Sequence, residues 1–247
     1  MTKTLTEKRA LVTGGSRGIG AAIVRRLARD GAHVAFTYPS SRDRAAETVK
    51  AAQAFGARGI AIRADSANAD AVVGAVERTV ADLGGMDILV NNAGVAILGP
   101  VTEFTIADFD RTMAINVRAV FVATQAAARH MTVGGRIINI GSGAAERMPF
   151  AGGGAYAMSK AALVGLVKGL ARDLGPRGIT INNVQPGPID TEMNPADSDF
   201  SKGFLRLMAL PRYGTVDDIA GMVSYLAGPE AGFITGASLT VDGGLAA

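Results

Sequence analysis

The sequence contains no cysteine, and this absence excludes disulfide bonds and thiolate metal sites. Its two histidines, His33 and His130, are isolated from each other and cannot form a zinc triad alone. No apolar run approaches the roughly eighteen residues of a membrane-spanning helix, and the first residues lack the apolar stretch of a signal peptide. We therefore expect a cytoplasmic protein without a bound metal and without a membrane contact.

The excess of positive over negative side chains is also small. The 25 Lys and Arg residues against 22 Asp and Glu leave a formal charge of +3, and no concentrated basic run indicates a nucleic-acid partner. The 247 residues are 48% hydrophobic and include 32 glycines, which suits one large α/β domain with many tight turns. No repeat, low-complexity tract or linker divides the chain, so we expect a single domain over residues 1–247.

Short apolar runs alternate with longer amphipathic segments, a pattern typical of a parallel sheet with helices on both faces. Strands are expected at residues 10–13, 33–38, 59–63, 87–91, 136–140, 179–185 and 238–241. Helices are expected at residues 19–30, 42–55, 69–83, 107–130, 155–174 and 216–227. The segment 186–211 contains four prolines and is expected to be irregular.

Residues 13–20, TGGSRGIG, lie where the first expected strand turns into the first expected helix. Glycines at this spacing allow a tight turn, a close approach of the backbone to a pyrophosphate and close helix packing, while free helix N–H groups face the anion. The segment predicts a dinucleotide-binding loop; the alternative is a glycine-rich turn without a ligand. The residues expected to hold the cofactor here are Gly14, Ser16, Arg17, Gly18, Ile19 and Gly20.

The end of the second expected strand bears on the choice of cofactor. In NAD-binding units an acidic residue about twenty positions beyond the glycines contacts the adenosine ribose, whereas this strand ends in Thr37 and Tyr38. Arg17, Ser40 and Arg42 are available to meet a 2′-phosphate, which favours NADP(H). The missing acid does not exclude NAD(H), and Arg42 alternatively is a solvated residue at the start of a helix.

Asp65 and Ser66 follow the third expected strand. A carboxylate at this place can accept a hydrogen bond from the adenine amino group. The alternative is that either residue only caps the helix that follows.

Tyr156 and Lys160 lie four residues apart in a helical pattern, so the phenol and the ammonium share one face. A tyrosine with a pKa of about 10 is a poor base at neutral pH, but a nearby cation stabilises the tyrosinate and lowers that value. The pair therefore suits acid–base catalysis. Taken alone, however, such a pair is more often a partly buried aromatic residue beside a solvated lysine.

Further motifs occur together with this pair, in a fixed order along nearly the whole chain. They are the glycine pattern, Asn91-Asn92-Ala93-Gly94, Asn116, Ser142, Tyr156-x-x-x-Lys160, Pro186-Gly187 and the closing TVDGG at residues 240–244. In this combination the chain resembles the short-chain dehydrogenase/reductase family. The resemblance is specific at the level of the superfamily, and no substrate follows from it.

The resemblance implies a Rossmann-like, doubly wound parallel sheet of about seven strands and hydride transfer between a nicotinamide cofactor and a ketone or secondary alcohol. Tyr156 would donate the proton to the carbonyl oxygen, and Ser142 would hydrogen-bond that oxygen. Lys160 would bind the nicotinamide ribose and lower the pKa of Tyr156. Asn116 would order a water beside Lys160, which makes Asn116 the fourth implied catalytic residue.

The resemblance also implies further contacts with the cofactor and the substrate. Asn92, Ala93 and Gly94 would lie beside the adenosine ribose, and Pro186, Gly187, Ile189 and Thr191 would meet the nicotinamide amide and a phosphate. Residues 190–211 would form a substrate lid. Its apolar residues, which either line the substrate pocket or pack into the core or a subunit contact, are Met193, Phe200, Phe204, Leu205 and Met208. Family members of this kind usually form homotetramers through the helices that hold Asn116 and Tyr156.

Three functions are compatible with these motifs. The first is NADP(H)-linked reduction of a small-molecule ketone, with 3-oxoacyl thioesters and xenobiotic-like ketones as candidates. The second is a nucleotide-binding regulatory protein with little turnover. The third is an epimerase or dehydratase that uses transient hydride transfer, but such relatives usually carry longer substrate domains than this chain has room for.

Overall fold

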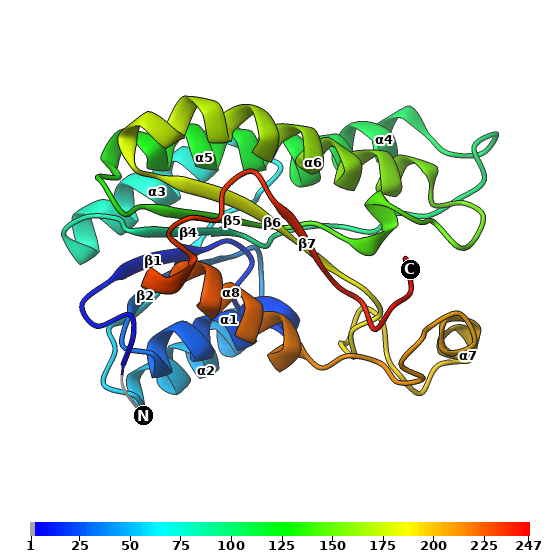
Figure 1. The fold of residues 1–247 in the computed structure, drawn as a ribbon, viewed down its shortest axis with the longest axis horizontal. Coiled ribbons are helices and arrows are strands. Elements are labelled where there is room, and N and C mark those ends of the chain that lie inside the picture. Colours follow the sequence, from blue (N-terminus) through cyan, green and yellow to red (C-terminus); the bar gives the residue numbers. More distant parts are fainter. Residues whose placement is uncertain (1–2) are drawn as a thin grey trace.

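The computed structural model describes residues 3–247, apart from the side chain of Phe200. A parallel sheet of seven strands forms the middle layer, in the order β3-β2-β1-β4-β5-β6-β7 (Figure 1). The strands are β1 (Arg9–Val12), β2 (His33–Tyr38), β3 (Gly59–Arg63), β4 (Ile88–Asn91), β5 (Arg136–Ile140), β6 (Thr180–Pro186) and β7 (Ser238–Val241). The doubly wound α/β fold expected from the sequence is confirmed. The strand order reverses between β1 and β4, which is where such sheets open a ligand crevice.

Helices cover both faces of the sheet (Figure 1). One face carries α1 (Gly18–Arg29), α2 (Arg42–Gln53) and α8 (Val216–Ala227), and the other carries α3 (Ala69–Leu83), α4 (Ile106–Met113), α5 (Ala119–His130) and α6 (Gly154–Leu174). Short 3₁₀ turns span Gly143–Ala145, Gly175–Arg177 and Pro229–Ala231. Local sequence fixes several helix ends: Thr215 and Asp218 form a capping box at the start of α8, and Gly84 ends α3 in the left-handed conformation.

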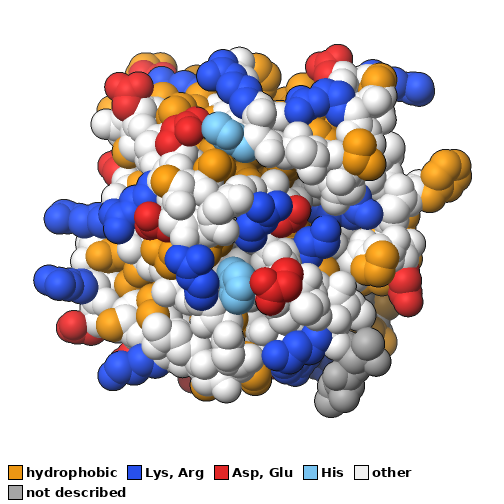
Figure 2. All heavy atoms as spheres, turned by 90° about the vertical axis from the view of Figure 1, so that its left-hand side faces the viewer, with side chains coloured by type: hydrophobic (Ala, Val, Ile, Leu, Met, Phe, Trp, Pro, Cys, Tyr) orange, Lys and Arg blue, Asp and Glu red, His pale blue; other side chains and the backbone are white. Residues whose placement is uncertain are grey.

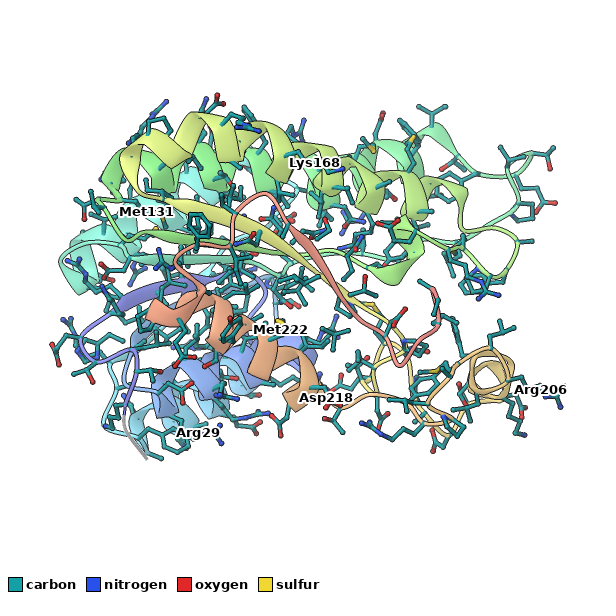
Figure 3. All side chains as sticks on the ribbon, in the orientation of Figure 1. Arg29, Met131, Lys168, Arg206, Asp218 and Met222 are labelled. Atoms are coloured by element: carbon teal, nitrogen blue, oxygen red, sulfur yellow. The ribbon has the colours of Figure 1, made fainter. Side chains whose placement is uncertain are left out.

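Alternate residues of the central strands pack into opposite halves of the core. In β1, Ala10 and Val12 join the cluster under α1 and α8, while Leu11 joins the cluster under α3 and α5. Met222 of α8, labelled in Figure 3, packs against the first cluster. Because both faces are covered, these strands are almost continuously apolar, and their polar ends stand out at the carboxyl edge.

The expected helix over 107–130 is divided in the structure. It is α-helical to Met113, passes through a π-helical turn at Ala114–Arg118, in which the Ala119 N–H donates to the Ala114 carbonyl, and continues as α5. A π turn takes one more residue than an α turn, and an apolar periodicity of three to four residues does not reveal that insertion.

The segment 186–211 was expected to be irregular and instead contains a short helix, α7 (Asp199–Leu205). Ser198 caps this helix by accepting a hydrogen bond from the Ser201 N–H. The helix lies beyond the carboxyl ends of the strands, near the C-terminus (Figure 1).

No helix within residues 3–247 is long and apolar enough to cross a membrane. In the same range no three His, Asp or Glu side chains are grouped so as to hold a metal ion. Positive and negative side chains are interspersed on the face of the molecule away from α7 (Figure 2). This face therefore lacks the field of one sign that attracts polyanions.

Candidate active site

A cavity of about 530 Å³ opens along the carboxyl ends of the strands. Seventeen residues were expected at the cofactor besides Ser40 and Arg42, and all of them line this cavity: Gly14, Ser16, Arg17, Gly18, Ile19, Gly20, Asp65, Ser66, Asn92, Ala93, Gly94, Tyr156, Lys160, Pro186, Gly187, Ile189 and Thr191. Ser142 lines it as well. The fold thus brings residues from distant parts of the chain to one crevice.

The loop between β1 and α1 depends on its glycines. They allow the backbone to pack closely against the protein behind it, which leaves room for a ligand in front. Gly14 and Gly18 have φ angles of 68° and 51°, which favour glycine. A Cβ on Gly20 would lie 2.2 Å from the Gly14 carbonyl oxygen and 2.5 Å from Asn92 Nδ2. Arg17, the N-cap of α1, makes no side-chain capping bond, so the first N–H groups of α1 remain available to an anion.

The adenosine side of the cavity differs from expectation. Ser40 and Arg42 are exposed and do not line the cavity, because the chain leaves the sheet at Tyr38 and Arg42 is already the first residue of α2. Thr37 and Pro39 face the cavity instead. Thr37 also fixes the loop, since its hydroxyl accepts a hydrogen bond of 2.9 Å from the Gly14 N–H.

Asp65 and Ser66 both line the cavity, as expected. Asp65 Oδ1 accepts a hydrogen bond of 2.9 Å from the Ala67 N–H. The cap of α3 is made by another residue, Asn68, whose side chain accepts from the Ala71 N–H. The reading of Asp65 or Ser66 as the helix cap is therefore wrong.

Tyr156 and Ser142 meet at the inner end of the cavity. Ser142 follows β5 and caps the 3₁₀ turn at Gly143–Ala145, with its Oγ accepting a hydrogen bond of 3.1 Å from the Ala144 N–H. Burial raises the pKa of the Tyr156 phenol, and a hydrogen bond with Ser142 offsets part of that rise. The expected lowering of this pKa by Lys160 is not seen, because desolvation of the phenol dominates.

Lys160 is buried one helical turn below Tyr156. Its Nζ donates a hydrogen bond of 2.9 Å to the Ile140 carbonyl and lies 5.9 Å from the centre of the Tyr156 ring. Burial lowers the pKa of Lys160 to about 8. The site therefore holds a cation whose charge changes close to neutral pH.

Asn116 lies in the π turn and is buried behind the cavity, whose wall it does not reach. Its Nδ2 donates to the Val95 carbonyl at 2.9 Å and to Ser159 Oγ at 3.0 Å, and its Oδ1 accepts from the Val95 N–H at 2.9 Å. A Cβ on Gly94 would lie 3.4 Å from both Asn116 Oδ1 and Lys160 Nζ. Asn116 and Lys160 thus both approach Gly94 in the loop after β4.

The far end of the cavity has an apolar wall from separate segments. Phe150, from the loop before α6, and Phe204, from α7, meet edge to face with ring centres 5.6 Å apart. Met193 lines the cavity as well, whereas Leu205 does not and Met208 is buried elsewhere; the side chain of Phe200 lies outside the described part of the chain. Lining residues that the sequence did not single out include Phe150, Leu98, Arg111, Arg147, Met148 and Leu245.

Comparison with known proteins assigns the chain to a family. A family model described as enoyl-(acyl carrier protein) reductase matches residues 14–246. A solved short-chain dehydrogenase/reductase from Serratia marcescens BCRC 10948 is 61% identical, with a TM-score of 0.98 over 99% of this chain and 100% of that chain. The chain belongs to the short-chain dehydrogenase/reductase family.

Two other proteins are also similar over nearly their whole length. The cyclic-di-GMP-binding biofilm dispersal mediator protein of Escherichia coli (strain K12) is 52% identical over 98% of both chains. A short chain dehydrogenase from Burkholderia cenocepacia J2315, solved in complex with NADP, is 55% identical, with a TM-score of 0.98 over 99% of this chain and 100% of that chain. The resemblance drawn from the motifs and the Rossmann-like fold of this family are thereby confirmed.

Replacing Gly20 by alanine is expected to weaken the binding of a nicotinamide dinucleotide by about tenfold or more. The added methyl group would sit 2.2 Å from the Gly14 carbonyl oxygen, so the loop has to shift away from the position that faces the pyrophosphate. Isothermal titration with NADPH measures the effect. Gly74→Ala in α3 is the matched control, since a Cβ there meets nothing within 4 Å. Equal affinities for Gly20→Ala and Gly74→Ala would contradict the role of the loop.

Proposed function

We propose that the protein is an NADP(H)-dependent oxidoreductase that reduces ketones to secondary alcohols, with Tyr156 as the proton donor. One observation carries the proposal. Ser142, from the loop after β5, and Tyr156 and Lys160, from α6, converge at the inner end of a cavity whose outer end is a glycine loop suited to a pyrophosphate.

The residues of the cavity fit a nicotinamide dinucleotide. A Cβ on Gly14 would lie 3.1 Å from the Ala93 Cα, and one on Gly187 would lie 2.5 Å from the Asp242 Cα, so the loops after β1 and β6 depend on glycine to keep this crevice open. When bound, the cofactor supplies the hydride. Arg17 beside the adenosine end favours the phosphorylated form, and the Burkholderia relative is solved with NADP.

The chain's own residues supply the proton and the orientation. The raised pKa of Tyr156 keeps the phenol protonated at neutral pH, which is the form that donates a proton during reduction. Ser142 binds the phenol in the free protein and is placed to donate a hydrogen bond to a carbonyl oxygen that approaches Tyr156. The Lys160 ammonium stabilises the tyrosinate that forms when the proton leaves. Asn116 acts from behind by holding the backbone of Val95.

The apolar lining of the substrate end favours ketones that carry an apolar substituent. Phe150, Phe204, Met193 and Met148 provide an apolar wall in the cavity that Tyr156 also lines. Two of these residues come from the segment 190–211, which acts in this proposal as a lid that excludes water from the reacting carbonyl. We also propose that the enzyme acts in the cytoplasm as a homotetramer formed through α5 and α6, where Phe121 and Met158 are each 45% exposed.

The test is a screen of the purified protein with NADPH and NADH against chemically diverse ketones, followed by the corresponding alcohols in reverse. Oxidation of NADPH that depends on the ketone supports the proposal. Tight binding of NADPH without turnover of any ketone would overturn it.

A second function, that of a nucleotide-binding regulatory protein, is favoured by the similarity to the Escherichia coli cyclic-di-GMP-binding protein. The same cavity presents helix N–H groups and arginines that suit phosphodiester groups. Calorimetric titration with cyclic di-GMP, with and without NADPH, separates the two. Competitive, high-affinity binding of cyclic di-GMP together with absent ketone turnover favours the regulator.

A further inference from the structure

Two arginines meet one carboxylate at the outer end of the cofactor cavity. Glu192 Oε2 lies 2.5 Å from Arg44 Nη1 and 3.9 Å from Arg17 Nη1. Arg17 belongs to the glycine loop, Arg44 to the first turn of α2, and Glu192 to the segment after β6. Arg17 and Glu192 both line the cavity. One carboxylate thus links the two sides of the crevice.

The position of this cluster coincides with the place where a 2′-phosphate is expected. Thr37 and Pro39, at the end of β2, line the cavity on the same side. Ser40 and Arg42, which the sequence suggested for the phosphate, do not line it. Arg63 also reaches this end, where its Nε donates to the Pro39 carbonyl at 3.4 Å, but the two arginines that face the Glu192 carboxylate are Arg17 and Arg44. A phosphate that binds them meets a negative charge already in place.

We propose that Glu192 occupies the anion site formed by Arg17 and Arg44 in the free protein and competes there with the 2′-phosphate of NADP(H). Glu192 then determines how strongly the protein prefers a 2′-phosphorylated nucleotide over its unphosphorylated counterpart. This inference rests on the proposed preference for NADP(H). It also links phosphate binding to the lid, because displacing Glu192 breaks the contact between α2 and the segment that carries Thr191 and Met193.

The size of the effect follows from the exposure of the cluster. The side chains of Arg44, Glu192 and Arg17 are 43%, 57% and 60% exposed. Ion pairs of this kind are partly screened by water and salt, so removing the competing charge is expected to change affinity by about two- to fivefold. The change is expected to shrink as the salt concentration rises.

Isothermal titration of Glu192→Gln with 2′,5′-ADP and with 5′-AMP, which lacks only the 2′-phosphate, tests the inference without a need for turnover. We expect 2′,5′-ADP to bind Glu192→Gln about two- to fivefold more tightly than it binds the wild type, and we expect the affinity for 5′-AMP to stay unchanged. Asp197→Asn is the matched control, because it makes the same change of charge at an exposed position of the same segment outside the cavity. It is expected to leave both affinities unchanged.

Arg44→Ala completes the test. As a single substitution, Arg44→Ala is expected to weaken the binding of 2′,5′-ADP. In the double variant, it is expected to abolish the gain in affinity that Glu192→Gln gives. Weaker binding of 2′,5′-ADP to Glu192→Gln, or equal tightening of both nucleotides, overturns the inference. If the wild type prefers 2′,5′-ADP and Glu192→Gln has the same preference, the role of Glu192 is refuted while the proposed preference for NADP(H) stands. A wild type without any preference for 2′,5′-ADP contradicts the proposed NADP(H) specificity as well.

Discussion

Replacing Tyr156 by phenylalanine is expected to lower the turnover of ketones by about a hundred- to ten-thousandfold, the range that general acid catalysis contributes in enzymes. The substitution removes only the hydroxyl group and leaves the ring that packs at the inner end of the cavity. Burial raises the pKa of this hydroxyl, so it stays protonated at neutral pH, as the proposed proton donor requires. Single-turnover measurements with saturating NADPH and a ketone from the screen give the rate of the chemical step.

The affinity for NADPH separates a loss of chemistry from a loss of the site. We expect the Kd of NADPH for Tyr156→Phe to stay within about twofold of the wild type, because the glycine loop and the segment after β6 are untouched. Tyr225→Phe removes the same group from an exposed side chain on α8 and is expected to retain full turnover. Near-normal turnover of Tyr156→Phe would rule out this residue as the proton donor.

Much of the sheet could be predicted from the sequence because its central strands are buried on both faces and form largely apolar runs. The bounds of β2, β3, β5 and β7 were predicted to the residue. The polar residues that follow these strands are the candidate site residues. Asn92 and Ser142, which follow β4 and β5, reach one cavity because parallel strands end at one edge of the sheet.

The environment of Asn116 could not be predicted in the same way. Its residue type and position were found through the family motifs, but the π turn that holds it adds one residue per turn without interrupting the apolar pattern. The turn buries the amide, where it binds the backbone of Val95. A contact between a side chain and a loop twenty-one residues away leaves no mark in local periodicity.

The charged end of the cavity was predicted only in part. The sequence indicated cations after β2, and in the structure Arg44, one helical half-turn beyond Arg42, forms an ion pair with Glu192, which lines the cavity. Which residue of a helix faces a ligand depends on where the helix starts, and strand and helix ends are the least certain part of a prediction from sequence. Glu192 follows Thr191 directly, yet its partners lie in the glycine loop and on α2, far away in the chain.

Replacing Lys160 by methionine is expected to make the fold more stable while it disables the enzyme. The pKa of Lys160 is about 8 in the folded protein against 10.5 for a free side chain. This shift corresponds to a cost of about 3 kcal/mol for burying the charge at pH 7. The variant loses the hydrogen bond to the Ile140 carbonyl, which offsets about 1 kcal/mol. The free energy of unfolding is therefore expected to rise by about 2 kcal/mol, as measured by urea denaturation.

The pH dependence of that gain follows from the direction of the shift. Between about pH 8 and 10.5 the unfolded wild type binds more protons than the folded one, so its stability rises with pH across this range. The advantage of Lys160→Met is fully present below pH 8 and disappears toward pH 10.5. Lys168→Met, at an exposed position of the same helix, is the control and is expected to show no such dependence (Figure 3).

The activity of Lys160→Met is expected to change in the opposite direction. Without the ammonium the tyrosinate that forms at Tyr156 has no buried cation near it, and turnover is expected to fall by about a hundredfold or more. In the wild type, ketone reduction is expected to decline as the pH rises through about 8, since Lys160 then loses its charge. That decline is expected to be absent in the residual activity of Lys160→Met. A variant that keeps both the rate and the decline would show that Lys160 contributes no charge to the reaction.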